Sequence, residues 1–193
     1  SLKKDILKVV NISISKQKSY NHLLRIALNK KIISISLRKR IPPKLDFNLK
    51  LVNLKREKPK YKNLKYKKIL SYLSKMNNSQ SDIALVYNKK ILETGTSNLL
   101  FIKDQKFFSP KKDYYEGNTY KFFKTKIKKI IKKDILLKEI NDYDEILLLG
   151  SGKGVTSVRT INEIKWKRKN LEKFKLLSKY YNVAINKCSS YRF

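Results

Sequence analysis

Small hydroxyl and amide side chains adjoin glycines at two places in the sequence, and both arrangements suit a phosphate group. Asn118 and Thr119 follow a glycine at the expected start of a helix, where unpaired backbone N–H groups favour an anion. Ser151 and Gly152 belong to the stretch 150–154, which holds three of the chain's five glycines and lacks the ending of a mononucleotide loop. Each feature alone is also typical of a helix cap or an ordinary turn.

Two reactive side chains precede these stretches. Lys62 lies in the segment YKNLKY, and a lysine amine can form a Schiff base with an aldehyde. The 47 basic residues include seven arginines and therefore 40 lysines, so composition alone favours an exposed surface lysine. Glu93 lies 31 positions further on, in ILETGTSNLLF, where small neighbours allow a close approach of the backbone. By itself it is equally typical of an exposed glutamate in a hairpin.

Taken in order, these four stretches resemble the class IV aminotransferase and aminodeoxychorismate lyase family, whose cofactor is pyridoxal 5′-phosphate. The first two match a lysine, a polar residue, leucine, one variable residue and tyrosine, and then a glutamate, small residues, asparagine and an apolar strand. The chain departs from the family at Asn118, Tyr120 and Ser157, where isoleucine, arginine and proline are usual. The resemblance covers nearly the whole chain, although family members are longer at the front.

The resemblance implies a role for each of these residues. Lys62 holds the cofactor, yields it to the substrate amine, and then acts as general base and acid. Glu93 faces the pyridine nitrogen and keeps it protonated, so that the ring can accept electrons from the substrate carbanion. Phosphate binding is implied for Asn118, Thr119 and Ser151, and substrate binding for Tyr66 and Gly152.

The spacing between Lys62 and Tyr66 bears on which reaction the protein catalyses. Tyr66 follows Lys62 by four positions, which is more similar to aminodeoxychorismate lyases and D-amino-acid aminotransferases than to branched-chain aminotransferases. We therefore predict release of 4-aminobenzoate and pyruvate from aminodeoxychorismate, a step of folate synthesis. A branched-chain or D-amino-acid aminotransferase is the alternative. The resemblance also implies a small-molecule amino substrate and a homodimer.

Hydrophobic periodicity predicts the elements that position these residues. Helices are expected over 2–10, 69–76 and 119–132, and strands over 23–28, 32–37, 47–54, 83–87, 98–103, 107–108 and 145–149. Together with the resemblance, this order predicts a two-domain α/β fold of the type IV class of pyridoxal-phosphate enzymes. We expect a partial N-terminal domain over 1–56, a linker over 57–61 and a C-terminal cofactor-binding domain over 62–193.

The formal net charge of +32 is also typical of a different class of protein, one that binds nucleic acid and has no catalytic activity. Two features argue against it. Lysine outnumbers arginine, which usually dominates phosphate and base recognition, and the lysines run from Lys3 to Lys187 without concentrating on one element. The abundance of Lys, Asn, Ile and Tyr instead matches the codon bias of an A·T-rich genome.

The cysteine content and hydropathy set the expected compartment. Cys188 is the only cysteine, which excludes an intramolecular disulfide and a thiolate zinc site, and no metal site is predicted. No apolar run approaches the roughly 20 residues that span a bilayer, and the start of the sequence lacks the apolar stretch of a signal peptide. We therefore expect a cytoplasmic protein without a membrane partner.

Overall fold

The computed structural model describes residues 1–15 and 22–188, which form two compact units. The first unit contains Ser1–Ile41 together with Cys188. Its elements are the helix α1 (Leu2–Ser15) and an antiparallel hairpin of β1 (His22–Leu28) and β2 (Ile33–Lys39), as the sequence predicted.

The second unit, Pro42–Lys187, is built on one large mixed sheet. Its strands lie in the order β8-β7-β6-β10-β11-β3-β4-β5-β9, with β12 paired to β11. The β11–β3, β3–β4 and β7–β8 pairs are parallel and the other pairs are antiparallel. The elements of this unit are β3 (Phe47–Asn53), α2 (Lys67–Leu73), β4 (Ser81–Tyr87), β5 (Lys90–Thr94), β6 (Asn98–Lys103), β7 (Lys106–Pro110), α3 (Asn118–Lys126), β8 (Ile130–Lys133), β9 (Ile135–Leu136), η1 (Leu137–Asp142), β10 (Glu145–Gly150), β11 (Gly154–Ile161), η2 (Asn162–Ile164), β12 (Trp166–Lys167) and α4 (Glu172–Asn186).

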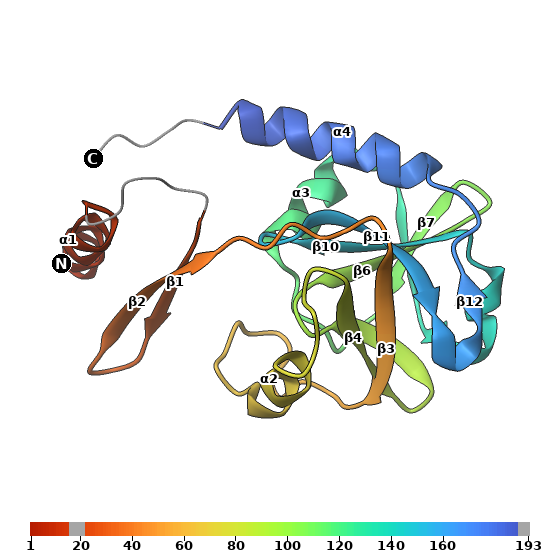
Figure 1. Cartoon of the computed structure of the whole chain (residues 1–193), viewed down its shortest axis with the longest axis horizontal. Coiled ribbons are helices and arrows are strands. Elements are labelled where there is room, and N and C mark those ends of the chain that lie inside the picture. Colours follow the sequence, from red (N-terminus) through yellow and green to blue (C-terminus); the bar gives the residue numbers. More distant parts are fainter. Residues whose placement is uncertain (16–21, 189–193) are drawn as a thin grey trace. The chain divides into compact units, whose positions relative to one another are not determined.

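The central strands of this sheet are buried on both faces, because alternate side chains of each strand enter different clusters. On β10, Ile146 and Leu148 join the core that β3, β4 and β6 also line, whereas Leu147 and Leu149 pack against α3 and α4. Helix α2 covers a third cluster that includes residues of β4. In Figure 1, α4 runs along one side of the unit and α2 lies near β3 and β4.

Strand β3 belongs to the large sheet, where it lies between β11 and β4. The two compact units therefore divide between Ile41 and Pro42, ahead of the linker expected over 57–61. The domain ranges 1–56 and 62–193 follow the family's convention and stay a prediction.

Several elements differ from the expectation. The helix expected over 119–132 ends at Lys126, and Ile130 and Ile131 instead form the edge strand β8 beside β7. Strand β5, which carries Glu93, was not predicted. Strand β11, helix α4, the two-residue strands β9 and β12 and the 3-10 helices η1 and η2 were also not predicted. The remaining expected helices and strands are present, with ends that differ by a few residues.

Candidate active site

The candidate site begins with a buried carboxylate at the end of β5. The Glu93 side chain is only 4% exposed, and its Oε1 accepts a hydrogen bond of 2.7 Å from Nε of Arg56. Its other oxygen, Oε2, lies 3.5 Å from the backbone N of Tyr115. Burial raises the pKa of the Glu93 carboxyl above its usual value, and the Arg56 guanidinium opposes this shift.

An asparagine holds the loop that leads into α3. Asn98, the first residue of β6, donates through Nδ2 to the carbonyl of Tyr115 and accepts through Oδ1 from the backbone N–H of Gly117. Gly117 is the N-cap of α3, and no side chain caps this end of the helix. Thr119 is buried in the first helical turn, and Asn118 is exposed. The free N–H groups of this turn therefore remain available to an anion.

The glycine-rich turn between β10 and β11 lies beside the same strand start. Leu149 pairs with Asn98 across the sheet, and a Cβ atom on Gly150 would collide with Oγ of Ser97. Glycine is therefore needed where these two backbones approach. Ser151 is exposed and Gly152 is partly exposed at the tip of the turn. The start of α3 and this turn therefore both lie next to Ser97 and Asn98, where β6 begins.

Lys62 and Tyr66 lie on the segment between β3 and α2. Asn63 folds this segment into a compact turn, because its Nδ2 donates to the carbonyls of Glu57, Lys58 and Tyr61. Arg56, six positions before Lys62, ties the start of the segment to Glu93. The Lys62 side chain is exposed, and no hydrogen bond or ion pair of the described residues joins it to Glu93, Thr119 or Ser151.

Sequence reasoning missed Arg56 as a partner of Glu93. Its contact spans 37 positions, so no local pattern contains it. A signal was nevertheless present, because arginine is scarce in this lysine-rich chain and Arg56 precedes the lysine segment. The residue Asn98 was part of the quoted motif, but its two hydrogen bonds to the loop before α3 emerge only from the structure.

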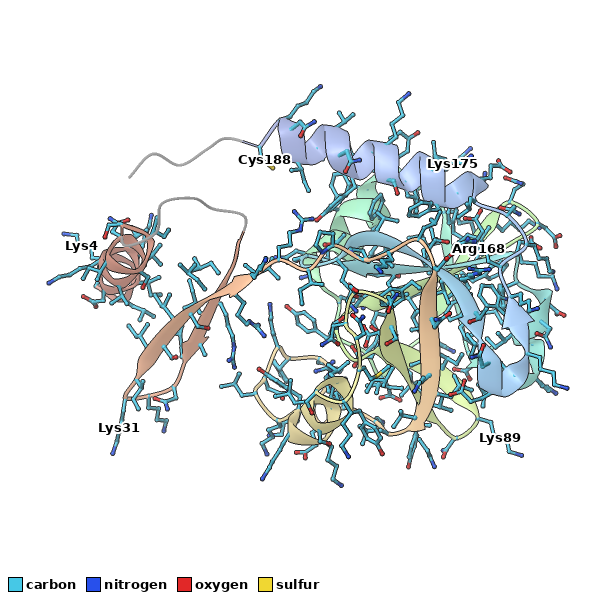
Figure 2. The ribbon with its side chains drawn as sticks, viewed as in Figure 1. Lys4, Lys31, Lys89, Arg168, Lys175 and Cys188 are labelled. Atoms are coloured by element: carbon cyan, nitrogen blue, oxygen red, sulfur yellow. The ribbon has the colours of Figure 1, made fainter. Side chains whose placement is uncertain are left out.

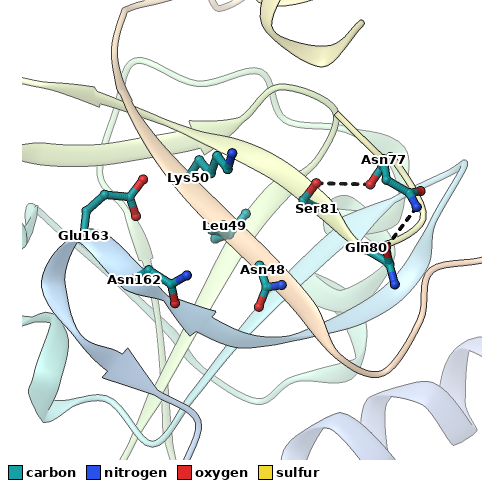
Figure 3. Close-up of a pocket in the computed structure, with 8 residues that line it drawn as sticks. All are labelled: Asn48, Leu49, Lys50, Asn77, Gln80, Ser81, Asn162 and Glu163. Carbon is teal, nitrogen blue, oxygen red and sulfur yellow. Dashed lines mark hydrogen bonds between the residues drawn. The ribbon is translucent and has the colours of Figure 1, made fainter. Parts of the chain in front are cut away.

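Two cavities in the second unit lie apart from these residues. The larger, of about 250 Å³, is lined by amides and a few charged groups and contains no predicted site residue (Figure 3): Asn48, Leu49, Lys50, Asn77, Gln80, Ser81, Asn162 and Glu163. The second, of about 230 Å³, has several lysines in its wall, of which Lys55 and Lys90 are paired with aspartates. Neither cavity includes Glu93 or the glycine-rich turn.

A mixed α/β sheet with a buried carboxylate, an uncapped helix start and a glycine turn at the ends of its strands can hold a phosphate-bearing group. The family comparison names the class of protein. The model of the class IV aminotransferase family matches residues 2–161, so the chain belongs to this family of pyridoxal-phosphate enzymes.

Solved structures with the same fold come from several members. A protein assigned as a 4-amino-4-deoxychorismate lyase from Legionella pneumophila has a TM-score of 0.74 at 16% identity, over 93% of this chain and 76% of that one. The branched-chain aminotransferase of Thermoproteus uzoniensis has a TM-score of 0.70 at 13% identity, over 93% and 70%. A branched-chain aminotransferase of Thermobaculum terrenum in its pyridoxal-phosphate form has a TM-score of 0.63 at 16% identity, over 85% and 62%. No curated protein sequence matches significantly.

The residues at these strand ends fit the cofactor of the family. Glu93 is buried, and among the described residues the one hydrogen bond to its Oε2 is the long contact from the backbone N of Tyr115, which leaves this oxygen suited to a pyridine nitrogen. The uncapped first turn of α3 and the turn after β10 supply N–H and hydroxyl donors of the kind that a phosphate needs. None of the described helices is both long enough and apolar enough to cross a bilayer.

Proposed function

We propose that this protein is an aminodeoxychorismate lyase that releases 4-aminobenzoate and pyruvate, acting in the cytoplasm as a homodimer. The observation that carries the proposal is the buried Glu93 carboxylate, whose Oε2 lies against Tyr115 in the loop that Asn98 holds before α3, next to the glycine-rich turn. The compact spacing of Lys62 and Tyr66 favours the lyase over a branched-chain aminotransferase.

When bound, the cofactor supplies an electron sink for the negative charge that develops on the substrate carbon. Lys62 takes the proton from the carbon that carries the substrate amine and returns a proton during product release. Glu93 holds a proton at the pyridine nitrogen, and Arg56 fixes the orientation of the carboxylate. Asn118, Thr119 and Ser151 hold the phosphate.

Tyr66 and Gly152 bind the substrate in this proposal. Gly152 lies at the tip of the glycine-rich turn, where the absence of a side chain leaves room for a substrate carboxylate. Loss of the enolpyruvyl group breaks a carbon–oxygen bond and makes the ring aromatic, so the lyase reaction needs no second substrate.

The homodimer is supported by an apolar row on the hairpin of the first unit. Leu24, Ile26 and Leu28 of β1 are each more than 40% exposed and pair with Leu37, Ile35 and Ile33 of β2. An apolar row of this kind is typical of a surface that is covered in an assembly.

The experiment that tests the reaction supplies the full-length protein and pyridoxal phosphate with aminodeoxychorismate. Pyruvate is followed with lactate dehydrogenase and 4-aminobenzoate by chromatography. We expect the two products in equal amounts. Transfer of the amino group from glutamate or D-alanine to a 2-oxo acid, without pyruvate from aminodeoxychorismate, would instead establish the aminotransferase alternative.

A further inference from the structure

A buried ion pair lies beneath the glycine-rich turn. Nζ of Lys153 is 3.0 Å from Oδ2 of Asp82, and these side chains are 10% and 0% exposed. The ammonium group also lies 4.6 Å from the ring centroid of Phe47, the first residue of β3. Among the lysines in the ion pairs of the described residues, Lys153 has the least exposed side chain, whereas most of the others are more than a third exposed.

The partner carboxylate is fixed by groups from the turn that follows Glu93. Oδ2 of Asp82 accepts hydrogen bonds from Oγ1 of Thr94 at 3.1 Å and from Oγ1 of Thr96 at 2.5 Å. Its Oδ1 accepts from the backbone N of Ile83 at 2.8 Å. A Cβ atom on Gly95 would lie 2.9 Å from Oδ1, so the turn approaches Asp82 as closely as a glycine allows.

These contacts join two parts of the candidate site that are far apart in sequence. Lys153 is two positions after Ser151, and Thr94 immediately follows Glu93. Asp82 therefore bridges the turn that carries the predicted phosphate ligand and the turn that carries the predicted pyridine partner. Removing two charged groups from water costs free energy, so a buried ion pair is weak evidence for added stability. The Asp82–Lys153 pair instead suits a role in fixing the position of the turn above it.

We propose that the Asp82–Lys153 pair is a positioning device that holds the turn 151–153 in place for the cofactor phosphate. This inference rests on the proposed function, because it takes the phosphate of pyridoxal phosphate as the ligand of the turn. Lys153 acts through Ser151 and the turn's backbone, and its own ammonium is occupied by Asp82.

The test compares the full-length protein with Lys153→Met, Asp82→Asn and the double variant that removes both charges. Lys153→Arg is the conservative replacement. The control is Lys103→Met, which breaks an ion pair of the same 3.0 Å length with Asp142 on the surface. Two quantities are measured: hydrogen exchange of peptides covering 150–155 without cofactor, and affinities for pyridoxal phosphate and for pyridoxal, which lacks the phosphate.

In Lys153→Met and Asp82→Asn we expect faster exchange in this turn and about tenfold weaker binding of pyridoxal phosphate, the equivalent of one lost hydrogen bond to a charged group. Lys153→Met should bind pyridoxal as the wild type does, because Lys153 acts only on the turn for the phosphate. Lys103→Met should behave as the wild type in both measurements, and Lys153→Arg should recover part of the loss. If a single variant fails to fold, the double variant, in which no uncompensated charge remains, gives the same comparison.

The outcomes separate this inference from the proposed function. The positioning role alone is overturned if the wild type binds pyridoxal phosphate normally and Lys153→Met shows either unchanged exchange in the turn or an equal loss of affinity for both cofactor forms. If the wild type binds neither form, the proposed function and the inference fall together.

Discussion

At the scale of single residues, the buried pair of Glu93 and Arg56 carries most of the chemistry. Burial raises the pKa of the Glu93 carboxyl, and the guanidinium limits that rise without cancelling it. A carboxyl whose pKa is raised on folding stabilises the fold at low pH and loses that contribution as the pH rises through the folded value. Without cofactor, Glu93 therefore contributes less to the stability of the fold as the pH rises toward neutral. A positively charged pyridinium next to Oε2 would offset this loss of stability.

The role of Glu93 can be tested with Glu93→Gln. An amide cannot keep the pyridine nitrogen protonated, so we expect kcat to fall about 100-fold, the usual effect of losing one preorganised charge at a reacting centre. Pyridoxal phosphate should still bind. The measurement is the rate of pyruvate release at saturating cofactor.

The matched control is Glu57→Gln, because the Glu57 side chain is 68% exposed and pairs with Lys65 on the surface. Its kcat should equal that of the wild type. A Glu93→Gln enzyme with unchanged kcat would remove Glu93 from the reaction.

The sequence predicted Lys62 and Glu93 as candidates because each lies in a short motif with a distinctive order of residues. It did not predict Arg56 as the partner of Glu93 or Lys153 as the partner of Asp82. These contacts cross 37 and 71 positions, and folding alone brings such residues together. The abundance of lysine also hid Lys153, because one buried lysine among 40 has no signature in the sequence.

At the scale of elements, helix α4 is fixed by a carboxylate from a different strand. Leu171, the N-cap of α4, provides no side-chain cap. Instead, Glu145 at the start of β10 accepts from the backbone N–H of Lys173 at 2.7 Å and of Phe174 at 2.9 Å. The two bonds join the first turn of α4 to the sheet. Glu145 is fully buried, and this burial raises the pKa of its carboxyl although the two backbone N–H groups oppose the rise.

Replacing this cap should destabilise the whole second unit. Glu145→Ala leaves two partly buried N–H groups without this acceptor, and we expect a loss of about 1 to 3 kcal/mol in the free energy of unfolding. Urea titration followed by circular dichroism gives the value. Glu172→Ala removes an exposed acid from the same helical turn and should cost less than about 0.5 kcal/mol. Equal losses in the two variants would argue against the capping role.

The loop before α3 contains Glu116, whose carboxylate forms ion pairs with Lys124 and Lys132. Partial burial raises the pKa of the Glu116 carboxyl, but the hydrogen bonds from Lys132 and Lys124 outweigh burial and bring the pKa below its usual value. A depressed pKa stabilises the fold above the unfolded value of about 4.3, and this contribution is lost as the pH falls through the folded value.

We therefore expect Glu116→Gln to be less stable than the wild type at pH 7, by no more than about 1 kcal/mol because the lysines are partly exposed. The difference should shrink once the pH falls below about 4.3 and vanish below the folded pKa. Urea midpoints between pH 3 and pH 7 measure it. A difference that stays constant over this range would mean that the carboxylate's charge contributes nothing.

Periodicity predicted most elements, and its failures have physical causes. Helix α3 and strand β8 follow each other with only three residues between them, and the isoleucines of β8 also continue a helical spacing. The pairing of β8 with β7 decides in favour of a strand, and this neighbour is not visible locally. Strand β5 was missed because its residues, KILET, do not alternate between apolar and polar side chains, although it carries Glu93.

At the scale of the whole molecule, the charge is distributed in the way the composition indicated. Four lysines labelled in Figure 2 lie on separate parts of the chain: Lys4 on α1, Lys31 and Lys89 in the turns β1–β2 and β4–β5, and Lys175 on α4. Several other lysines pair with surface acids, as Lys103 does with Asp142. This scatter does not favour the nucleic-acid alternative, which would predict a concentrated basic face and an affinity that falls steeply with salt.

The fold class was predictable from sequence because the order of motifs is specific to the family even where individual positions differ. The family match over residues 2–161 and the solved structures confirm the α/β fold of the type IV class. The sequence predicted the family but did not decide between substrates. A lyase and branched-chain aminotransferases share this fold, and their low identity to the chain does not decide between the two activities.

The most direct test of this account is the absorbance spectrum of the purified full-length protein with pyridoxal phosphate, compared with Lys62→Ala and with Lys65→Ala as the neighbouring control. The wild type and Lys65→Ala should develop a band at about 410 to 430 nm, the range of a lysine-bound cofactor. Lys62→Ala should lack this band. At a cofactor concentration of 100 times the dissociation constant, the wild type should also gain about 2.7 kcal/mol in stability. A band of equal strength in Lys62→Ala, or none in the wild type, would contradict the assignment of Lys62.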